Sequence, residues 1–184
     1  MKKVCVFGSY KNLSRKEKRN TVKLGRLLAE KGFVVMTGGF GGTMEDVSRG
    51  AKEAGGKTIG VTYYKWRGKA HKKPNKYVDE EIKTENIFRR IEIMAKNADA
   101  FIVLPGGTGT LLELAACLEL VNKGLMRPKY IIAIGDFWKS AVQKLIREPV
   151  LSAKARSALK AGSCRELIMF VATPEQAVKE LLRL

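Results

Sequence analysis

Short, continuously apolar segments alternate with longer amphipathic segments along the whole chain, and this alternation limits the possible fold more than any other feature. The apolar segments are predicted strands at residues 3–7, 33–36, 58–62, 100–104, 130–134 and 167–171. The segments between and after them are predicted helices at residues 16–31, 44–54, 86–97, 111–121, 137–147 and 174–182. Apolar strands joined by helical crossovers form a parallel sheet. We therefore predict an α/β fold, a Rossmann-like three-layer sandwich with a mostly parallel sheet and helices on both faces.

The length of the chain fits one domain, which we predict to span residues 1–184. A chain of 184 residues can bury a sizeable core, and no linker, internal repeat or low-complexity segment divides it. No stretch approaches the ~20 consecutive apolar residues of a membrane span, and the first residues form a predicted strand rather than a signal sequence. We therefore expect a cytoplasmic protein that does not enter a membrane.

The cysteine and histidine residues do not form a recognisable metal site. The chain has three widely spaced cysteines in apolar surroundings, which fit reduced core thiols better than a disulfide framework. His71 is the only histidine, and no pair of Cys or His residues has the spacing of metal ligands. We predict no metal and no cofactor.

A glycine-rich turn connects the predicted strand at residues 100–104 to the helix that follows it. Glycine lets the backbone turn sharply there and approach a ligand without a Cβ atom in the way. Thr108 or Thr110 is expected to cap the helix, so that N–H groups, hydroxyls and the positive end of the helix dipole converge on one spot. Such a spot suits a phosphate. The expected phosphate-binding residues are Gly106, Gly107, Thr108, Gly109 and Thr110.

Glu113 lies one turn into a helix that is apolar nearly all round. Such a helix is predicted to be buried, and a buried carboxylate needs either a structural partner or a functional role. The turn before it matches neither of two known phosphate fingerprints. The third glycine of G-x-G-x-x-G is Leu112 here, and no Lys followed by Ser or Thr completes a Walker A loop. We expect neither NAD binding nor ATP hydrolysis.

A second glycine cluster follows the predicted strand at residues 33–36. The carboxyl ends of parallel strands lie along one edge of a sheet, where ligands bind, so this cluster is expected beside the first glycine turn. Two such turns can hold two parts of one molecule, although close packing of a helix on a strand would also explain the glycines. The candidate binding residues at this second position are Gly38, Gly39, Gly41, Gly42, Thr43 and, after the first strand, Ser9.

Arg90 is the arginine best placed to reach the same edge. Steps of about 100° per residue put one apolar stripe on the predicted helix at residues 86–97. The stripe consists of Ile87, Phe88, Ile91, Met94 and Ala95. Arg89 falls nearly opposite this stripe, whereas Arg90 falls at its border near the amino-terminal end of the helix. Its side chain can therefore reach the ligand-binding edge while its stem packs.

The chain is strongly basic, with 35 basic against 18 acidic side chains and a formal net charge of +17. Such a charge can indicate nucleic-acid binding. The cations are spread over predicted helix faces and loops, so we interpret most of them as solvated surface charge. Residues 65–77 form a denser run that mixes cations with aromatic side chains. This mixture is typical of single-strand binders, and it equally suits a mobile lid over an anionic nucleotide.

The first glycine turn resembles a family motif. Residues 105–113 match, position for position, the PGGxGTxxE motif of the LOG family, the cytokinin-activating nucleoside 5′-monophosphate phosphoribohydrolases often misnamed lysine decarboxylases. Residues 37–45 resemble the GGGxxGxME turn of the same family, and the similarity spans roughly residues 3–135. By this resemblance Arg90, aligned on Met94, takes the place of the catalytic arginine, and Glu45 is a secondary candidate for a ribose or water contact.

The chain departs from the LOG family beside that arginine. Arg89 replaces a glutamate and Ile91 replaces a lysine, changes that put the family's activity in question more than its fold. The departures also resemble the molybdenum-cofactor carrier proteins, which bind a phosphorylated pterin without converting it. The resemblance further implies a homodimer, to which the helix at residues 111–121 and Ile93, apolar yet off the buried stripe, could contribute.

We predict a hydrolase that cleaves the N-glycosidic bond of a nucleoside 5′-monophosphate to the free base and ribose 5-phosphate. Glu113 would stabilise the oxocarbenium-like transition state, and Arg90 would hold the phosphate or assist the departing base. The base would lie against Tyr63, Tyr64 or Trp66. A non-catalytic carrier of a phosphorylated ligand such as molybdenum cofactor is the alternative, and an RNA-binding protein the second alternative. We expect a phosphorylated small molecule rather than nucleic acid as the partner.

Overall fold

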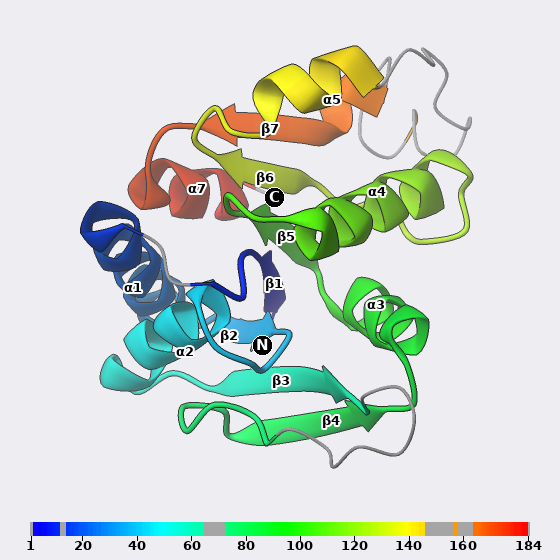
Figure 1. Ribbon diagram of the computed structural model, residues 1–184. Helices are drawn as coiled ribbons and strands as arrows, with labels where there is room; N and C mark the ends of the chain where they lie inside the picture. Colours follow the sequence, from blue (N-terminus) through cyan, green and yellow to red (C-terminus); the bar gives the residue numbers. More distant parts are fainter. Residues whose placement is uncertain (1, 12–13, 65–72, 146–156, 158–163, 184) are drawn as a thin grey trace.

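The computed structural model describes residues 2–11, 14–64, 73–145, 157 and 164–183 (Figure 1). Within them one sheet contains seven parallel strands in the order β4-β3-β2-β1-β5-β6-β7. The strands are β1 Lys3–Phe7, β2 Val34–Thr37, β3 Thr58–Tyr63, β4 Glu80–Thr84, β5 Ala100–Val103, β6 Ile131–Ile134 and β7 Ile168–Val171. The predicted α/β fold with a parallel sheet is thus confirmed, and six of these strands were predicted within a residue or two of their bounds.

Strand β4 was not predicted. It pairs only with β3, from Ile59 opposite Glu80 to Tyr63 opposite Thr84, so it forms one edge of the sheet. Its sequence Glu-Glu-Ile-Lys-Thr has a single apolar residue, and most of the strand is exposed or half-buried. An edge strand can carry charged residues because one side of it faces solvent. Apolar content alone therefore could not identify it.

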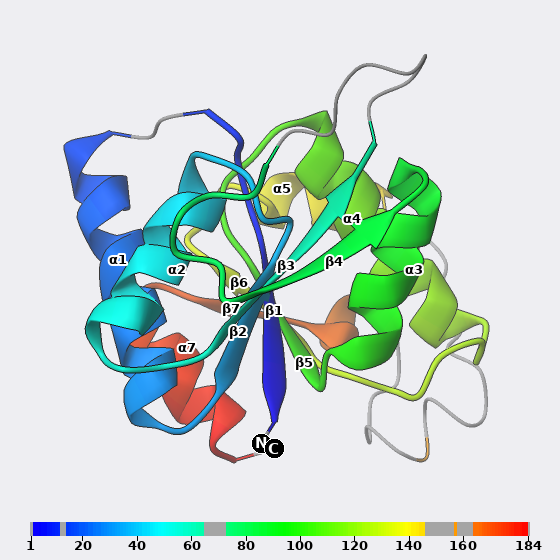
Figure 2. The same cartoon turned by 90° about the horizontal axis from the view of Figure 1, so that it is seen from below.

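The helices form two layers, one on each face of the sheet (Figure 2). One face carries α1 Arg15–Glu30, α2 Thr43–Glu53 and α7 Pro174–Leu181, and the other carries α3 Ile87–Asn97, α4 Thr108–Asn122 and α5 Lys139–Leu145. A short 3-10 helix, η1, spans Cys164–Leu167. Alternate residues of β1 divide between the two cores: Val4 and Val6 pack with α1, whereas Cys5 and Phe7 pack beneath α3 and α4.

The burial of α3 and α4 differs from the prediction. Phe88 was placed in the buried stripe of α3, but it is 72% exposed, so that prediction was wrong. The buried arc of α3 is turned away from Phe88 and toward Arg90, which lies in the protein interior. Helix α4 is not buried all round either, because Leu111 and Leu112 are exposed. Apolar residues show which sides of a helix can be buried. The neighbouring helices and strands determine which of those sides is buried in the folded protein.

No helix in the described ranges is long and apolar enough to cross a membrane.

Candidate functional site

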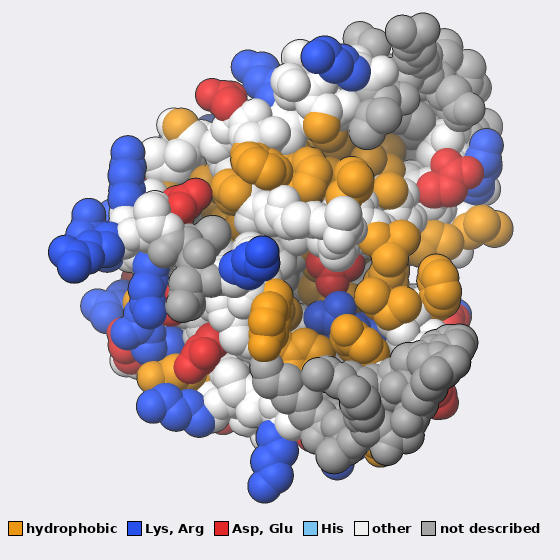
Figure 3. Space-filling model, viewed as in Figure 1, with side chains coloured by type: hydrophobic (Ala, Val, Ile, Leu, Met, Phe, Trp, Pro, Cys, Tyr) orange, Lys and Arg blue, Asp and Glu red, His pale blue; other side chains and the backbone are white. Residues whose placement is uncertain are grey.

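A cavity of about 630 Å³ opens at the carboxyl edge of the sheet. Cavities of this size hold small ligands. Its walls come from the ends of β1 and β3 and from the starts of α2, α3 and α4. The lining residues are Gly8, Ser9, Tyr10, Lys11, Phe40, Met44, Tyr63, Ile87, Arg90, Gly107, Thr108, Gly109, Thr110 and Glu113. Figure 3 shows this face of the molecule, with an acidic and a basic side chain in a hollow bordered by apolar side chains.

The start of α4 forms one wall of the cavity. Its N-cap residue is Gly107, which provides no side-chain cap, so the prediction that Thr108 or Thr110 caps the helix was wrong. The Thr110 side chain instead packs against Gly106, where an added Cβ atom would overlap the Thr110 hydroxyl. The first helical hydrogen bond runs from Leu111 N–H to the Gly107 carbonyl, at 3.0 Å.

The first amide groups of α4 consequently remain available to a ligand. Among the described residues, no protein group accepts a hydrogen bond from the N–H of Thr108, Gly109 or Thr110, and all three residues line the cavity. The first turn of α4 contains no acidic side chain to offset the positive end of its dipole. This arrangement favours an anion against these amides.

Arg90 and Glu113 form a buried ion pair at the floor of the cavity. They come from α3 and α4, and only 6% of Arg90 and 7% of Glu113 is exposed. Arg90 Nη1 donates to Glu113 Oε1 at 3.0 Å. The structure therefore brings together the two residues predicted to be catalytic, which lie 23 positions apart in the sequence.

The Arg90 guanidinium is held on several sides. Its Nε donates to the Val61 carbonyl at 2.7 Å, and its Nη2 lies 3.8 Å from the Met44 sulfur. The rings of Phe40 and Tyr63 lie 5.9 and 5.6 Å from the guanidinium carbon, within the range of cation–π attraction. An arginine so anchored is suited to orienting Glu113 and to presenting fixed positive charge to the cavity.

Glu113 has an unusual pKa. Burial raises the pKa of its carboxyl from 4.5 to about 7, even though the neighbouring Arg90 guanidinium lowers it. The carboxyl therefore changes its charge near neutral pH, as many catalytic carboxyl groups do. The side chain also lines the cavity, so a ligand in the cavity could reach it.

The second glycine turn, between β2 and α2, packs closely against its neighbours. A Cβ atom on Gly38 would overlap Arg90 Nη2. Gly39 has φ +77°, and a Cβ atom on it would lie 2.9 Å from the Thr62 methyl group. The turn thus makes room for the Arg90 guanidinium, a role that the sequence did not predict.

The residues predicted to bind ligand around this second turn lie in different places. Ser9 lines the cavity, as does Phe40 from the turn itself. Thr43 donates both its N–H and its hydroxyl to the Ser9 carbonyl, at 2.9 and 3.0 Å. Outside the cavity lining lie Gly38, Gly39, Gly41, Gly42, Thr43 and Glu45. A direct ligand contact by any of these six stays a prediction.

Six lining residues were not predicted as site residues from the sequence: Gly8, Tyr10, Lys11, Phe40, Met44 and Ile87. Tyr10 and Lys11 directly follow Ser9, so their place after a strand could have identified them. Lys11 has no ion-pair partner among the described residues, and it adds positive charge to the rim. Tyr63, a predicted base contact, lines the cavity, whereas Trp66 and the rest of residues 65–72 lie outside the described ranges.

The two departures from the LOG pattern lie away from the cavity lining. Ile91 is buried in the core beneath α3, and Arg89 is exposed and paired with Glu92 on the outer face of the same helix. Neither side chain contributes to the cavity wall. The wall therefore contains no lysine at the position that follows the arginine.

The model of the SLOG cluster4 family matches residues 1–167. A probable cytokinin riboside 5′-monophosphate phosphoribohydrolase of Oryza sativa subsp. japonica is 34% identical over 153 residues, which cover 80% of this chain and 66% of the rice protein. The cytokinin riboside 5′-monophosphate phosphoribohydrolase LOG7 of Arabidopsis thaliana is 30% identical over 183 residues. This match covers 91% of this chain and 79% of the Arabidopsis protein.

A protein of Archaeoglobus fulgidus is 36% identical over 103 residues, which cover 55% of this chain. The matches span 64% of the archaeal relative and 66% of the rice one, just under two thirds of each.

Solved structures share the fold. The X-ray structure of TM1055 has a TM-score of 0.76 and 26% identity over the whole of both chains. The molybdenum cofactor binding protein of Rippkaea orientalis has a TM-score of 0.73 and 24% identity, over 99% of this chain and 96% of that protein.

Proposed function

This chain belongs to the SLOG cluster4 family, a LOG-type family, and from that premise we propose that it hydrolyses the N-glycosidic bond of a nucleoside 5′-monophosphate. The products are the free base and ribose 5-phosphate. The observation that carries the proposal is the buried Arg90–Glu113 pair at the floor of a cavity whose wall is the uncapped start of α4.

The phosphate binds against the amides of Thr108, Gly109 and Thr110. These N–H groups and the positive end of the α4 dipole stabilise a dianion without requiring a charged side chain. Lys11 at the rim adds a full positive charge. Binding energy from the phosphate then holds the attached sugar in place over the floor of the cavity.

Glu113 acts at the sugar. Cleavage of an N-glycosidic bond develops positive charge on the ribose, and the Glu113 carboxylate stabilises that charge and orients the attacking water. Arg90 keeps the carboxylate in position through its hydrogen bond, and its bonds to Val61 and Glu113 fix the guanidinium beside the cavity. A planar base can pack on the aromatic side chains of Phe40 and Tyr63, which line the cavity.

Product analysis tests the proposal. The purified chain is incubated with AMP and other nucleoside monophosphates, and free base and ribose 5-phosphate are measured by liquid chromatography and mass spectrometry. We expect turnover with at least one base. Glu113→Gln should keep the shape of the pair and lower kcat by at least about 100-fold, as is common when charge stabilisation is removed. Absence of turnover with every base tested contradicts the hydrolase proposal.

A carrier of a phosphorylated ligand is the second candidate, supported by Ile91 in place of the lysine of the LOG pattern. The same cavity and amides would then bind the ligand without converting it. The two candidates differ in what Glu113→Gln does to binding. A carrier without turnover should keep its affinity in this variant, and mass spectrometry of the ligand that copurifies with the wild type should show a phosphorylated compound other than a nucleoside monophosphate.

We also propose that the chain forms a homodimer through exposed apolar side chains on α3 and α4. Phe88, Leu111 and Leu112 are exposed there, beside the cavity wall, and grouped apolar surface favours association. Light scattering after size exclusion should give twice the chain mass. Leu112→Glu should give monomers, whereas Leu182→Glu, an equally apolar exposed position beyond α7 on the other face of the sheet, should not. A monomeric wild type contradicts the dimer.

A further inference from the structure

The segment from Lys73 to Asp79 leads into the edge strand β4 and is hydrogen-bonded to the second glycine turn. Asn75, which is half-buried, makes three hydrogen bonds to that turn. Its backbone N–H donates to the Gly39 carbonyl at 2.8 Å, and its side-chain Nδ2 donates to the carbonyls of Gly39 and Phe40 at 3.1 and 2.9 Å. One side chain therefore holds two successive carbonyl groups of the turn.

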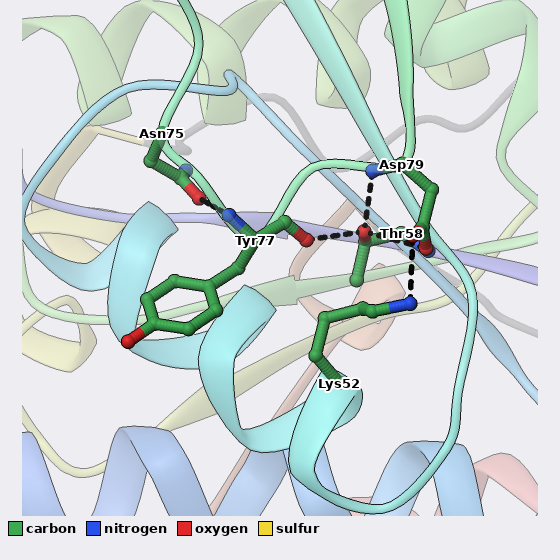
Figure 4. A network of polar contacts seen from close by, with 5 residues as sticks. All are labelled: Lys52, Thr58, Asn75, Tyr77 and Asp79. Carbon is green, nitrogen blue, oxygen red and sulfur yellow. Dashed lines mark hydrogen bonds and ion pairs between the residues drawn. The ribbon is translucent and has the colours of Figure 1, made fainter.

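The orientation of the Asn75 amide is set by its other end. Oδ1 accepts a hydrogen bond from Tyr77 N–H at 3.1 Å, as Figure 4 shows, and the Asn75 carbonyl accepts from Val78 N–H at 3.2 Å. These bonds form a turn with asparagine at its first position, a common role for this residue. With Oδ1 engaged there, Nδ2 necessarily points toward the glycine turn.

The glycine turn in turn borders Arg90. Gly38 leaves the space that the guanidinium occupies, and the Phe40 ring lies beside the guanidinium and edge-to-face with Tyr63, at a centroid distance of 5.8 Å. A shift of the turn would move the Phe40 ring and the backbone at Gly38 relative to Arg90. Because Arg90 donates to Glu113, such a shift would also disturb the carboxylate.

We propose that Asn75 is a positioning residue that holds the Arg90–Glu113 pair in place through the glycine turn. Its effect on Arg90 follows from the contacts alone, and its effect on turnover rests on the proposed function. Catalytic groups that are displaced by small distances lose much of their effect. Asn75 makes no hydrogen bond to Arg90 and is not itself a lining residue of the cavity, so sequence position and cavity lining would both overlook it.

The same segment offers a matched control at its other end. Asp79 accepts hydrogen bonds from Thr58 N–H and Thr58 Oγ1 at 2.9 and 3.1 Å, and it pairs with Lys52 at 2.6 Å (Figure 4). These contacts attach the segment to β3 and α2 without touching the glycine turn. Asp79→Ala therefore removes at least as many polar contacts as a change at Asn75.

Asn75→Asp is the decisive variant. The carboxylate keeps an oxygen for Tyr77 N–H but removes both N–H donations, and it faces the Gly39 and Phe40 carbonyls with negative charge. The first readout is hydrogen exchange of Arg90 Nε–H by NMR, assigned by its loss in Arg90→Lys. This proton is protected by its bond to Val61 in the wild type.

We expect Asn75→Asp to accelerate that exchange by about 10-fold or more, the change that follows when one to two hydrogen bonds are lost. Steady-state kinetics with the best nucleoside monophosphate should show kcat lowered by about 10-fold and KM changed by less than about 3-fold, because the phosphate-binding amides of α4 are untouched. Asp79→Ala should leave the Arg90 exchange rate and kcat within about 2-fold of the wild type. This variant should nevertheless unfold at a lower temperature than the wild type.

Two results overturn the inference. The first is an Arg90 Nε–H exchange rate in Asn75→Asp equal to that of the wild type. The second is an equal acceleration of that exchange in Asp79→Ala, which would indicate a general loss of stability. The exchange measurement needs no substrate. If the wild type hydrolyses no nucleotide, the proposed function fails while the exchange arm still decides the role of Asn75.

Discussion

Two glycine-rich turns of similar sequence precede α2 and α4, and the protein uses them differently. Before α4, the first amides have no acceptor within the described residues, and no acid lies in the first turn. Before α2, Thr43 N–H is taken by the Ser9 carbonyl, and Glu45 and Asp46 already offset the dipole. A glycine-rich strand-to-helix turn can therefore serve either to bind an anion or to pack closely.

The α2 turn contributes to the site through the space it leaves. Gly38 of this turn leaves space for the Arg90 guanidinium, and the ring of Phe40 lies beside that guanidinium. The α4 turn contributes amides directly to the cavity. Substitutions in the two turns should accordingly fail for different reasons, one by displacing a charged side chain and the other by repelling the ligand.

The largest effect is expected at Gly38. In Gly38→Ala the methyl group would overlap Arg90 Nη2, so the guanidinium must leave its place or the turn must shift. We expect kcat to fall by about 100-fold, because a displaced catalytic group loses much of its effect. We expect the free energy of unfolding to fall by about 2 kcal/mol, because the added methyl group overpacks the interior. Enzyme kinetics and chemical denaturation measure the two changes.

Gly41→Ala is the control from the same turn, because the nearest atom to an added Cβ is Glu45 Oε2 at 3.9 Å. It should keep nearly wild-type kcat. Equal losses in the two variants would mean that the α2 turn binds the ligand directly instead of accommodating Arg90.

An acid in the first turn of α4 should make that turn resemble the start of α2. Thr108 is exposed at the cavity wall, and Thr108→Glu places negative charge beside the phosphate site while it compensates the helix dipole. We expect nucleotide affinity to fall by about 10-fold or more, with little loss of stability. Isothermal titration with an unreactive nucleotide analogue measures the affinity.

Thr108→Gln, which has the same shape without the charge, should bind several-fold more tightly than Thr108→Glu. Glu45→Gln removes an acid from α2 and should leave affinity within about 2-fold of the wild type, because the Glu45 side chain does not line the cavity. A large loss in Glu45→Gln would instead support the ribose or water contact predicted from the family resemblance.

The last comparison concerns pH dependence and distinguishes Glu113, which follows the α4 turn, from Asp46, which follows the α2 turn. Glu113 has its pKa raised to about 7 by burial, so the folded protein binds a proton that the unfolded chain releases near 4.5. Stability should therefore fall as pH rises through this window, by about 3 kcal/mol at most. In Glu113→Gln this loss should be absent, as urea titrations at several pH values would show.

Turnover should show the opposite pH dependence. The ionised carboxylate is the active form, so kcat/KM should rise with pH toward a plateau above about 7. Burial also raises the pKa of Asp46 at the start of α2, against the effect of Lys18 and Arg49, but Asp46 does not line the cavity. Asp46→Asn should leave the midpoint of the kinetic profile unchanged, and a shifted midpoint would contradict the assignment to Glu113.

Local sequence was sufficient for most elements and predicted the edge of the sheet at which the cavity opens. Strand β5 and the turn before α4 were predictable because their burial and glycine pattern are encoded within a dozen neighbouring residues. The pairing of Arg90 with Glu113 was implied only in part, since helix periodicity placed Arg90 at the ligand-binding edge without identifying its partner. Tyr10, Lys11 and Phe40 follow strand ends and could have been found with the same rule.

By itself, the sequence determined the alternation of strands and helices and hence the parallel sheet, because apolar periodicity and glycine positions depend on neighbouring residues. Only the tertiary structure decided that β4 completes the edge, that Phe88 is exposed, and that Gly38 makes room for Arg90. It also decided which of the two glycine turns keeps its amides for a ligand. Those outcomes depend on contacts between residues far apart in the chain, and local periodicity contains no information about which distant group fills a given space.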